Sequence, residues 1–255
     1  MFPNDTDKAW EYYGKIDPYY GVATSEENRT SYLTQDARSK FFDSGTQYIE
    51  LILRLIHDHL DSSFKPTQAL DFGCGVGRLV IPLARICKSV TGIDISESMI
   101  EEAKNNCRER GVSNVTFVKS DDSLSGVSGS FDLINSFIVF QHIPPRRGKV
   151  ILQKLVGKLQ ENGIGVLHFT YFGKESLGRK LLIEAYKSIP FLFGLRNLLK
   201  GKPISEPMMQ MNEYNLNDLF KILQESGCHR CHIRFTDHGM YGVIILFQKG
   251  HLDIL

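Results

Sequence analysis

Short apolar runs alternate with helical patterns along the middle of the chain, and this alternation limits the possible folds more than any other feature. Helices are predicted at residues 78–87, 97–110 and 146–159, and strands at residues 68–72, 89–94, 115–118, 131–136 and 164–171. The connections between them are short, so successive strands should run parallel through right-handed crossovers. The sequence therefore predicts an α/β fold built on a mostly parallel sheet.

The C-terminal segment follows a different pattern. After a predicted helix at 216–225, residues 231–236 alternate between apolar and polar side chains, whereas residues 243–247 are all apolar. An alternating strand has one face in water, and an unbroken apolar strand is covered on both faces. A hairpin turning at 237–239 would place its second strand inside the sheet. The prediction is a seven-stranded, doubly wound sheet whose last strand is antiparallel.

Two regions lie outside this alternating pattern. Residues 1–65 and residues 172–214 are predicted to form a helical cap, over a core made of residues 66–171 and 215–255. Within the second region, segment 179–202 carries six basic residues, one acidic residue and many apolar ones. Such a stretch could be a lid over the active site, a dimer surface or a peripheral contact with an anionic membrane.

A glycine-rich turn follows the first predicted strand. Gly73, Gly75 and Gly77 have no Cβ, so the backbone there can turn tightly and approach a ligand, and the next helix offers free N–H groups. The third glycine is one residue too early for the fingerprint of a nicotinamide dinucleotide, and no Walker lysine follows. An NAD-dependent oxidoreductase is therefore the less favoured alternative, and ATP is disfavoured.

Three acids lie at or just beyond the ends of consecutive predicted strands. They are Asp71, Asp94 and Asp121, and open α/β sheets bind ligands at this edge. Asp94 could accept hydrogen bonds from both hydroxyls of a ribose. Each acid alone could equally be a helix cap or a solvated loop residue. Together with the glycine turn, they predict a nucleoside site.

Four segments resemble the motifs of class I S-adenosylmethionine-dependent methyltransferases. They are LDFGCGVGRL, VTGIDISESMI, SDD and FDLINSFIVFQHIP, in this order and at the family's spacing. The similarity covers roughly residues 66–171, and the terminal hairpin agrees with the family's reversed last strand. The resemblance implies a Rossmann-like fold, S-adenosyl-L-methionine as cofactor and S-adenosyl-L-homocysteine as product.

The resemblance also implies roles for individual residues. Asp71, the turn at 73–77 and Ser136 would hold the methionine moiety. Asp94 would hold the ribose, while Ile95 and Met99 would enclose the adenine unless they are ordinary core residues. The polar edge of the adenine would meet Asp121 and the backbone of Asp122. The implied set is Asp71, Gly73, Cys74, Gly75, Gly77, Asp94, Ile95, Met99, Asp121, Asp122 and Ser136.

The methyl acceptor must be recognised outside these motifs. The fourth strand lacks the Asn/Asp-Pro-Pro-Tyr segment of the family's DNA- and protein-amino-methylating members, so we expect a small molecule or a glycan or lipid intermediate, methylated at a hydroxyl oxygen. His142 follows that strand and is a candidate general base at its ordinary pKa of ~6.5, with a structural role as the alternative. The candidate substrate contacts are Tyr13, Tyr20, Tyr171 and His238.

Composition narrows the remaining choices. With 30 basic and 29 acidic residues, a nucleic-acid partner gains no support from net charge. No apolar run reaches ~18 residues, so no transmembrane helix is expected. No signal peptide is evident and the five cysteines are scattered, which favours a cytoplasmic protein. We expect a monomer or a homodimer. Cys228 and Cys231 lack a second ligand pair, so no metal is expected. A catalytically silent S-adenosylmethionine-binding module is the non-enzymatic alternative.

Overall fold

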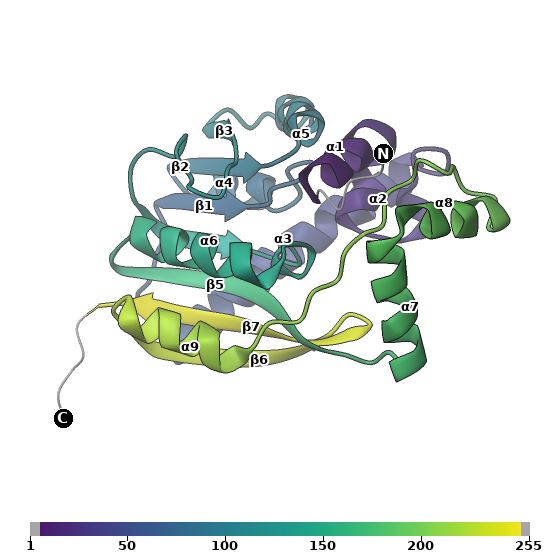
Figure 1. The fold of residues 1–255 in the computed structure, drawn as a ribbon. Helices are drawn as coiled ribbons and strands as arrows, with labels where there is room; N and C mark the ends of the chain where they lie inside the picture. Colours follow the sequence, from purple (N-terminus) through teal and green to yellow (C-terminus); the bar gives the residue numbers. More distant parts are fainter. Residues whose placement is uncertain (1–5, 251–255) are drawn as a thin grey trace.

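Seven strands form one mixed sheet in the computed structural model, which describes residues 6–250 apart from the side chains of Leu177, Lys180, Leu181, Glu184, Lys187, Ser188 and Pro190 (Figure 1). The strands are β1 (Gln68–Phe72), β2 (Ser89–Asp94), β3 (Val115–Lys119), β4 (Phe131–Ser136), β5 (Leu159–Gly173), β6 (Cys228–Asp237) and β7 (Met240–Lys249). Their order is β3-β2-β1-β4-β5-β7-β6, and β1 to β5 are parallel. The predicted doubly wound sheet is confirmed, with its switch point between β1 and β4.

Strand β7 lies between β5 and β6 and pairs with both in the antiparallel sense. Its residues from Val243 to Phe247 are all buried, whereas β6 is the edge strand and is mostly exposed. The unbroken apolar run is therefore covered on both faces, and the alternating run is not. The predicted hairpin is confirmed, and its turn contains Gly239 at a φ of 82°.

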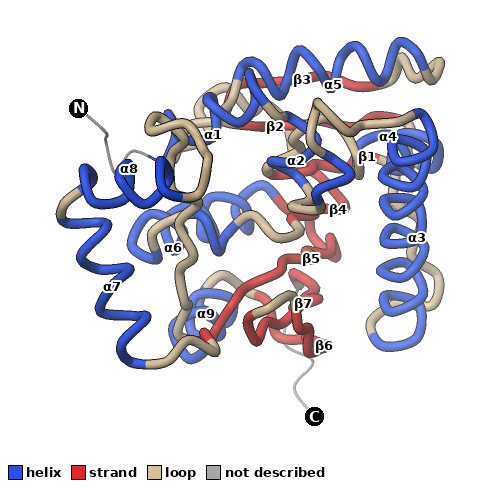
Figure 2. Tube along the Cα trace, turned by 90° about the vertical axis from the view of Figure 1, so that its right-hand side faces the viewer, coloured by secondary structure: helices blue, strands red, loops and turns tan. Residues whose placement is uncertain are grey.

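Helices cover both faces of the sheet, and Figure 2 shows the sheet between two layers of helices. In α9, Leu219, Ile222 and Leu223 recur at the spacing of one helical face and are buried against β5 and β7, because that face is the apolar one. One layer contains α3 (Gln35–His59), α4 (Val80–Ile86) and α5 (Glu97–Glu109), and the other contains α6 (Pro145–Lys158) and α9 (Leu216–Glu225).

Further helices of the described chain lie beyond the carboxyl ends of the parallel strands (Figure 1). They are α1 (Thr6–Ile16), α2 (Pro18–Val22), α7 (Leu177–Ser188) and α8 (Pro190–Leu199). The hydroxyl of Tyr13 in α1 donates a 2.8 Å hydrogen bond to the carbonyl of Pro207, so the N-terminal helices contact the segment that follows α8. In residues 6–250, no helix is long and apolar enough to cross a membrane.

Several element boundaries differ from the sequence expectation, and α3 and β5 show why. Helix α3 begins at Gln35, where the Thr34 side chain accepts a hydrogen bond from the Ala37 N–H, whereas the apolar periodicity begins only near Phe41. Strand β5 extends beyond the predicted 164–171 at both ends, because it pairs with β4 at Leu159 and with β7 as far as Gly173. In both cases the extra residues are held by a cap or a partner strand rather than by a local apolar pattern.

Candidate active site

The glycine-rich turn after β1 has a backbone that side chains would not tolerate. Gly73, Gly75 and Gly77 have φ values of 73°, 51° and 87°. A Cβ on Gly73 would lie 2.4 Å from a methyl carbon of Val139, and a Cβ on Gly75 would lie 2.5 Å from a methyl carbon of Val22. The sequence therefore needs glycine both for the turn itself and for the close approach of its neighbours.

Asp94 ends β2 beside this turn. One carboxylate oxygen accepts a 2.8 Å hydrogen bond from the Gly75 N–H, and the other accepts a 2.9 Å hydrogen bond from the Ser96 N–H. Burial raises the pKa of Asp94, while these backbone donors oppose that rise. Each oxygen keeps a further lone pair, so the carboxylate can still accept hydrogen bonds from a diol.

Asp71 lies deeper, on the face of the sheet covered by α3. The Asn135 amide donates a 2.7 Å hydrogen bond to its carboxylate, and the Tyr48 hydroxyl donates a 3.2 Å hydrogen bond to the Asn135 carbonyl oxygen. Burial raises the pKa of Asp71 to about 7, and the hydrogen bond from Asn135 and the charge of Arg78 work against it. Asn135 was not among the site residues predicted from the sequence, although it is a polar residue near the end of the apolar strand 131–136.

A small cavity lies against the turn. Its lining includes Gly73, Gly75, Asp94 and Met99 from the core and Val22 from α2, and its volume is about 90 Å³. Cavities that hold drug-sized ligands typically measure ~300–1,000 Å³. The N-terminal helices thus lie close over the predicted cofactor site, and a nucleoside would need them to shift.

The residues around this cavity fit S-adenosylmethionine. The Ser136 hydroxyl is buried and has no hydrogen-bond partner among the described residues, and the next residue, Phe137, lines the cavity. The glycine cradle, the buried Asp94 carboxylate and an unpaired hydroxyl are the groups that a nucleoside with a polar amino-acid tail would use. Two other residues of the turn contact the core: Cys74 is buried, and a Cβ on Gly77 would lie 3.4 Å from the Cβ of Ala103.

Asp121 and the backbone of Asp122, expected at the adenine edge, are not among the residues that line the small cavity, and both side chains have partners. Hydrogen bonds from Ser125 and Ser123 lower the pKa of Asp121, which is exposed. Asp122 forms an ion pair with Arg147, with an N···O distance of 2.7 Å. Of the two residues expected to enclose the adenine, Met99 lines the cavity and is buried, and Ile95 is half-buried at the end of β2.

His142 lies at the other wall of the small cavity, in a 3-10 turn after β4. Its Nδ1 is 2.8 Å from the Gln210 carbonyl oxygen, so Nδ1 carries the proton and donates. Nε2 then keeps a lone pair, which faces the Gln141 amide nitrogen at 3.2 Å. Burial lowers the pKa of His142 to about 4, so the ordinary value of ~6.5 assumed from the sequence is wrong for this site.

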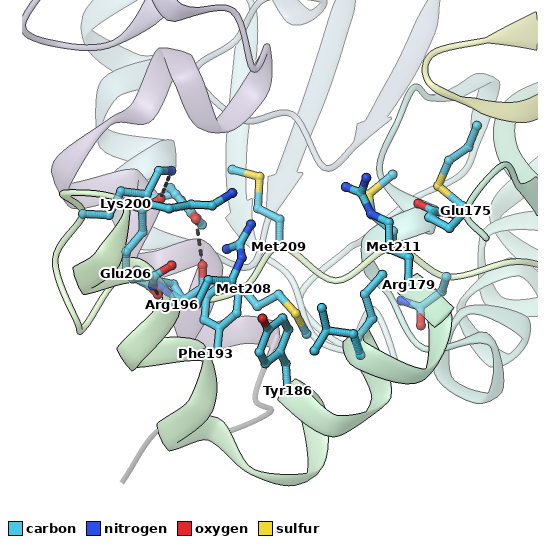
Figure 3. Close-up of a pocket in the computed structure, with 18 of the residues that line it drawn as sticks. Glu175, Arg179, Tyr186, Phe193, Arg196, Lys200, Glu206, Met208, Met209 and Met211 are labelled. Atoms are coloured by element: carbon cyan, nitrogen blue, oxygen red, sulfur yellow. Dashed lines mark hydrogen bonds and ion pairs between the residues drawn. The ribbon is translucent and has the colours of Figure 1, made fainter. Parts of the chain in front are cut away.

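Figure 3 shows a much larger cavity, of about 900 Å³. The two cavities are neighbours, because Ile143 lines the small one and Pro145, two residues later, lines the large one. Tyr13 and Tyr20 line the large cavity, as expected of substrate contacts. The rest of its lining comes mainly from α7, α8 and residues 206–213, and includes Arg179, Tyr186, Phe193, Arg196, Lys200, Met208, Met209 and Met211.

The other two candidate substrate residues do not line that cavity as described. Tyr171 packs near Phe235, with ring centroids 6.4 Å apart. His238 lies near Phe137 and His168, with centroid distances of 5.6 and 5.7 Å. Trp10 of α1 lines the small cavity and meets the His142 ring edge-on, with the ring centroids 4.7 Å apart.

Comparison with known protein sequences identifies the core of the chain. Residues 69–163 match a family described as a methyltransferase domain. A segment of 100 residues is 31% identical to a 23S rRNA (uracil(1939)-C(5))-methyltransferase of Burkholderia thailandensis, and covers 39% of this chain and 22% of that protein. The chain therefore spans about a fifth of the length of the curated relatives that it matches.

Solved structures extend the similarity to the whole fold. Magnesium protoporphyrin IX methyltransferase from Synechocystis PCC 6803, determined with bound S-adenosylhomocysteine, has a TM-score of 0.62 at 21% identity, and the match covers 96% of this chain and 100% of that one. The N-methyltransferase NodS from Bradyrhizobium japonicum has a TM-score of 0.59 at 16% identity, over 96% and 99% of the two chains. With its motifs, its sheet order and the matched segment in agreement, residues 69–163 form a methyltransferase domain of the class I, S-adenosylmethionine-dependent type.

Proposed function

We propose that this protein transfers a methyl group from S-adenosylmethionine to a small-molecule acceptor, at a hydroxyl oxygen. The observation that carries the proposal is the pair of adjoining cavities at one edge of the sheet. One has the glycine turn and Asp94 in its wall, and the other is large enough for a drug-sized molecule. A cofactor in the first and an acceptor in the second would meet beside His142.

When bound, the cofactor supplies a methyl group on an already activated sulfonium. The chain's own part is then to position the acceptor oxygen and to take up its proton. In this proposal Asp94 accepts hydrogen bonds from the ribose, the turn at 73–77 approaches the methionine part, and Ser136 and Asp71 contact its polar groups. The cofactor-binding residues remain those expected from the sequence, with Trp10 and Val22 added from the cap.

His142 is proposed as the proton acceptor. Its Nδ1–H is committed to Gln210, so Nε2 is the basic atom, and the Gln141 amide would have to release it. A pKa of about 4 makes it a weak base that is neutral at pH 7. A weak base is sufficient here, because a hydroxyl becomes strongly acidic as its oxygen bonds to the methyl carbon.

The acceptor cavity suits a molecule with both apolar and polar parts. Four methionines and the rings of Tyr186 and Phe193 offer apolar surface that adapts in shape. The guanidinium of Arg196 lies 5.2 Å from the centroid of the Phe193 ring, and Figure 3 shows Arg179 and Arg196 on different sides of Met209. A glycan or lipid intermediate meets this description better than a folded nucleic acid does.

Isotope transfer tests the proposal. The protein is incubated with S-adenosylmethionine labelled in the methyl group and with separate small-molecule and RNA fractions of a cell extract. Label should enter the small-molecule fraction, and Ile183→Trp, which fills the large cavity, should prevent it. Ile86→Trp, at an exposed position on α4, is the matched control. Label that enters only RNA would contradict the proposed acceptor class and leave the methyltransferase assignment intact.

A further inference from the structure

Helix α8 has its apolar stripe on the outside. Phe191 is 70% exposed, Leu195 44%, Leu198 57% and Leu199 82%, and Leu192 is exposed beside them. These positions follow the spacing i, i+1, i+4, i+7 and i+8, which is one face of an α-helix. A helix that covers a protein core normally buries such a stripe, so this face is available for another surface.

The opposite face of α8 belongs to the protein. Asn197 is buried and donates a 2.9 Å hydrogen bond to the Glu206 carbonyl, and Phe193 and Arg196 line the large cavity. In Figure 1, α8 lies at the periphery of the molecule, beyond the ends of the parallel strands. The helix therefore separates the cavity from whatever its outer face contacts.

One exposed basic residue, Lys200, lies at the end of the stripe, whereas Arg196 and Lys202 are half-buried and line the large cavity. Residues 189–204 contain Arg196, Lys200 and Lys202 and no acidic residue. Lys202 pairs with Glu206 at 2.7 Å, while Lys200 is exposed next to Leu199 at the end of the helix. An apolar stripe with a basic end complements a surface that is apolar inside and negatively charged outside.

We propose that α8 docks on an anionic lipid bilayer and lies in its interface. The helix has 10 residues, half of the ~20 needed to span the hydrocarbon, so it can only lie along the surface. Docked in this way, it would hold the large cavity against the membrane, from which an amphiphilic molecule could enter. The docking concerns the outer surface and stands or falls independently of the proposed function.

A second copy of the chain fits this face less well. Two copies of segment 189–204 facing each other would offer no acidic residue of that segment to the exposed Lys200 of either copy. Anionic lipid supplies the missing negative charge and accepts an exposed leucine without a matching pocket. A dimer through α8 is therefore an outcome that the experiment must be able to detect.

Vesicle flotation tests the docking with the full chain. The protein is mixed with vesicles of phosphatidylcholine alone or of phosphatidylcholine with phosphatidylglycerol. It should float with the second and weakly or not at all with the first, and flotation should decrease as NaCl rises from about 0.05 to about 0.5 M. Leu198→Gln/Leu199→Gln should lower the partition coefficient at least about tenfold, because two leucines leave the interface.

Phe235→Gln is the matched control, because Phe235 on β6 is 73% exposed but lies outside the stripe. This variant should float like the wild type, and far-UV circular dichroism melting should show all three proteins folded. The proposal is overturned if the wild type does not float with phosphatidylglycerol, or if the double variant floats equally well. A concentration-dependent dimer that the double variant loses, without flotation, would assign the stripe to self-association instead.

Discussion

The proposed cofactor region and the proposed acceptor region of this protein are formed by different parts of the chain. Around Asp94 and the glycine turn, backbone groups and short side chains define the site, held by the hydrogen-bonded ends of β1 and β2. Around the large cavity, long side chains from α7, α8 and the segment after them do so (Figure 3). Sheet geometry fixes the first site, whereas the second can vary without altering the sheet, which suits a family that keeps one cofactor and changes acceptors.

The largest effect is expected from changing His142, the proposed general base, which lies between the two regions. His142→Ala should lower turnover by ~10²–10⁴-fold, the usual contribution of a general base, with affinity for S-adenosylhomocysteine nearly unchanged. His142→Gln should restore little, because an amide cannot take up the proton. The acid limb of the pH–rate profile should lie near the lowered pKa of about 4 and disappear in both variants.

His229→Ala, at an exposed position on β6, is the control for this experiment. Recovery of most activity in His142→Gln would mean that the histidine only orders Gln141 and Gln210. Attention would then move to Tyr13 and Tyr20.

The second prediction concerns the core alone. Asp94→Ala should weaken binding of S-adenosylhomocysteine by ~2–4 kcal/mol, because two hydrogen bonds to a charged acceptor are lost. The variant should also lose some stability, since the N–H groups of Gly75 and Ser96 lose their acceptor. Calorimetry gives the affinity, and Asp218→Ala on α9 provides the comparison. An unchanged affinity would restrict Asp94 to shaping the turn.

The third prediction uses pH to test the buried carboxyl behind the site. The pKa of Asp71 is raised to about 7 in the folded protein, from ~3.9 when unfolded, so the folded state binds more protons between these values. Its contribution to stability is present below pH ~4 and is lost as the pH rises through about 7. As the pH rises from ~4 to about 7, the free energy of unfolding of Asp71→Asn should therefore increase relative to that of the wild type, by roughly a few kcal/mol.

Urea unfolding at several pH values measures this difference. His142 titrates in the opposite direction, since its lowered pKa favours the folded state above pH ~6.5, but it is present in both proteins. A stability difference between wild type and Asp71→Asn that did not change with pH would show that Asp71 is not protonated on folding.

The fourth prediction separates backbone strain from contact with the cap. Gly75→Ala puts a Cβ 2.5 Å from Val22, at a φ of 51°, and should weaken binding of S-adenosylhomocysteine by ~1–2 kcal/mol. Gly129→Ala meets the same kind of strain at a φ of 83°, with no described atom within 4 Å, and should leave binding unchanged. Adding Val22→Ala to Gly75→Ala should recover part of the affinity, and no recovery would mean that α2 does not cover the turn.

The smallest effect on cofactor affinity is expected when the proposed acceptor region is removed. Replacing residues 179–202 by a short Gly/Ser linker should change the affinity for S-adenosylhomocysteine by less than about tenfold, because the core holds its own site. Acceptor turnover should disappear, because α7 and α8 form a wall of the large cavity. Loss of cofactor binding in a folded variant would show that the two sites depend on each other.

Elements bounded by strong local signals were predicted from the sequence to the residue. Strand β1 is an apolar run between Pro66 and Gly73, and α9 begins after Asn215, whose side chain caps the helix by accepting from the Asn217 N–H. The glycine turn was equally clear, because its positive φ angles restrict it to glycine. These features depend on neighbours within a few residues, and a single sequence contains that information.

The cap and the chemistry of the site depend on contacts that the sequence does not reveal. Tyr13 meets Pro207 across 194 residues, and His142 meets Gln210 across 68. The lowered pKa of His142 and the exposed stripe of α8 exist only after these segments have packed, because burial sets both of them. Sequence alone therefore determined the sheet, the turn and the class of cofactor. Tertiary packing decided how the site is covered, the pKa of the proposed base and which surface remains exposed, because burial is a property of the whole fold.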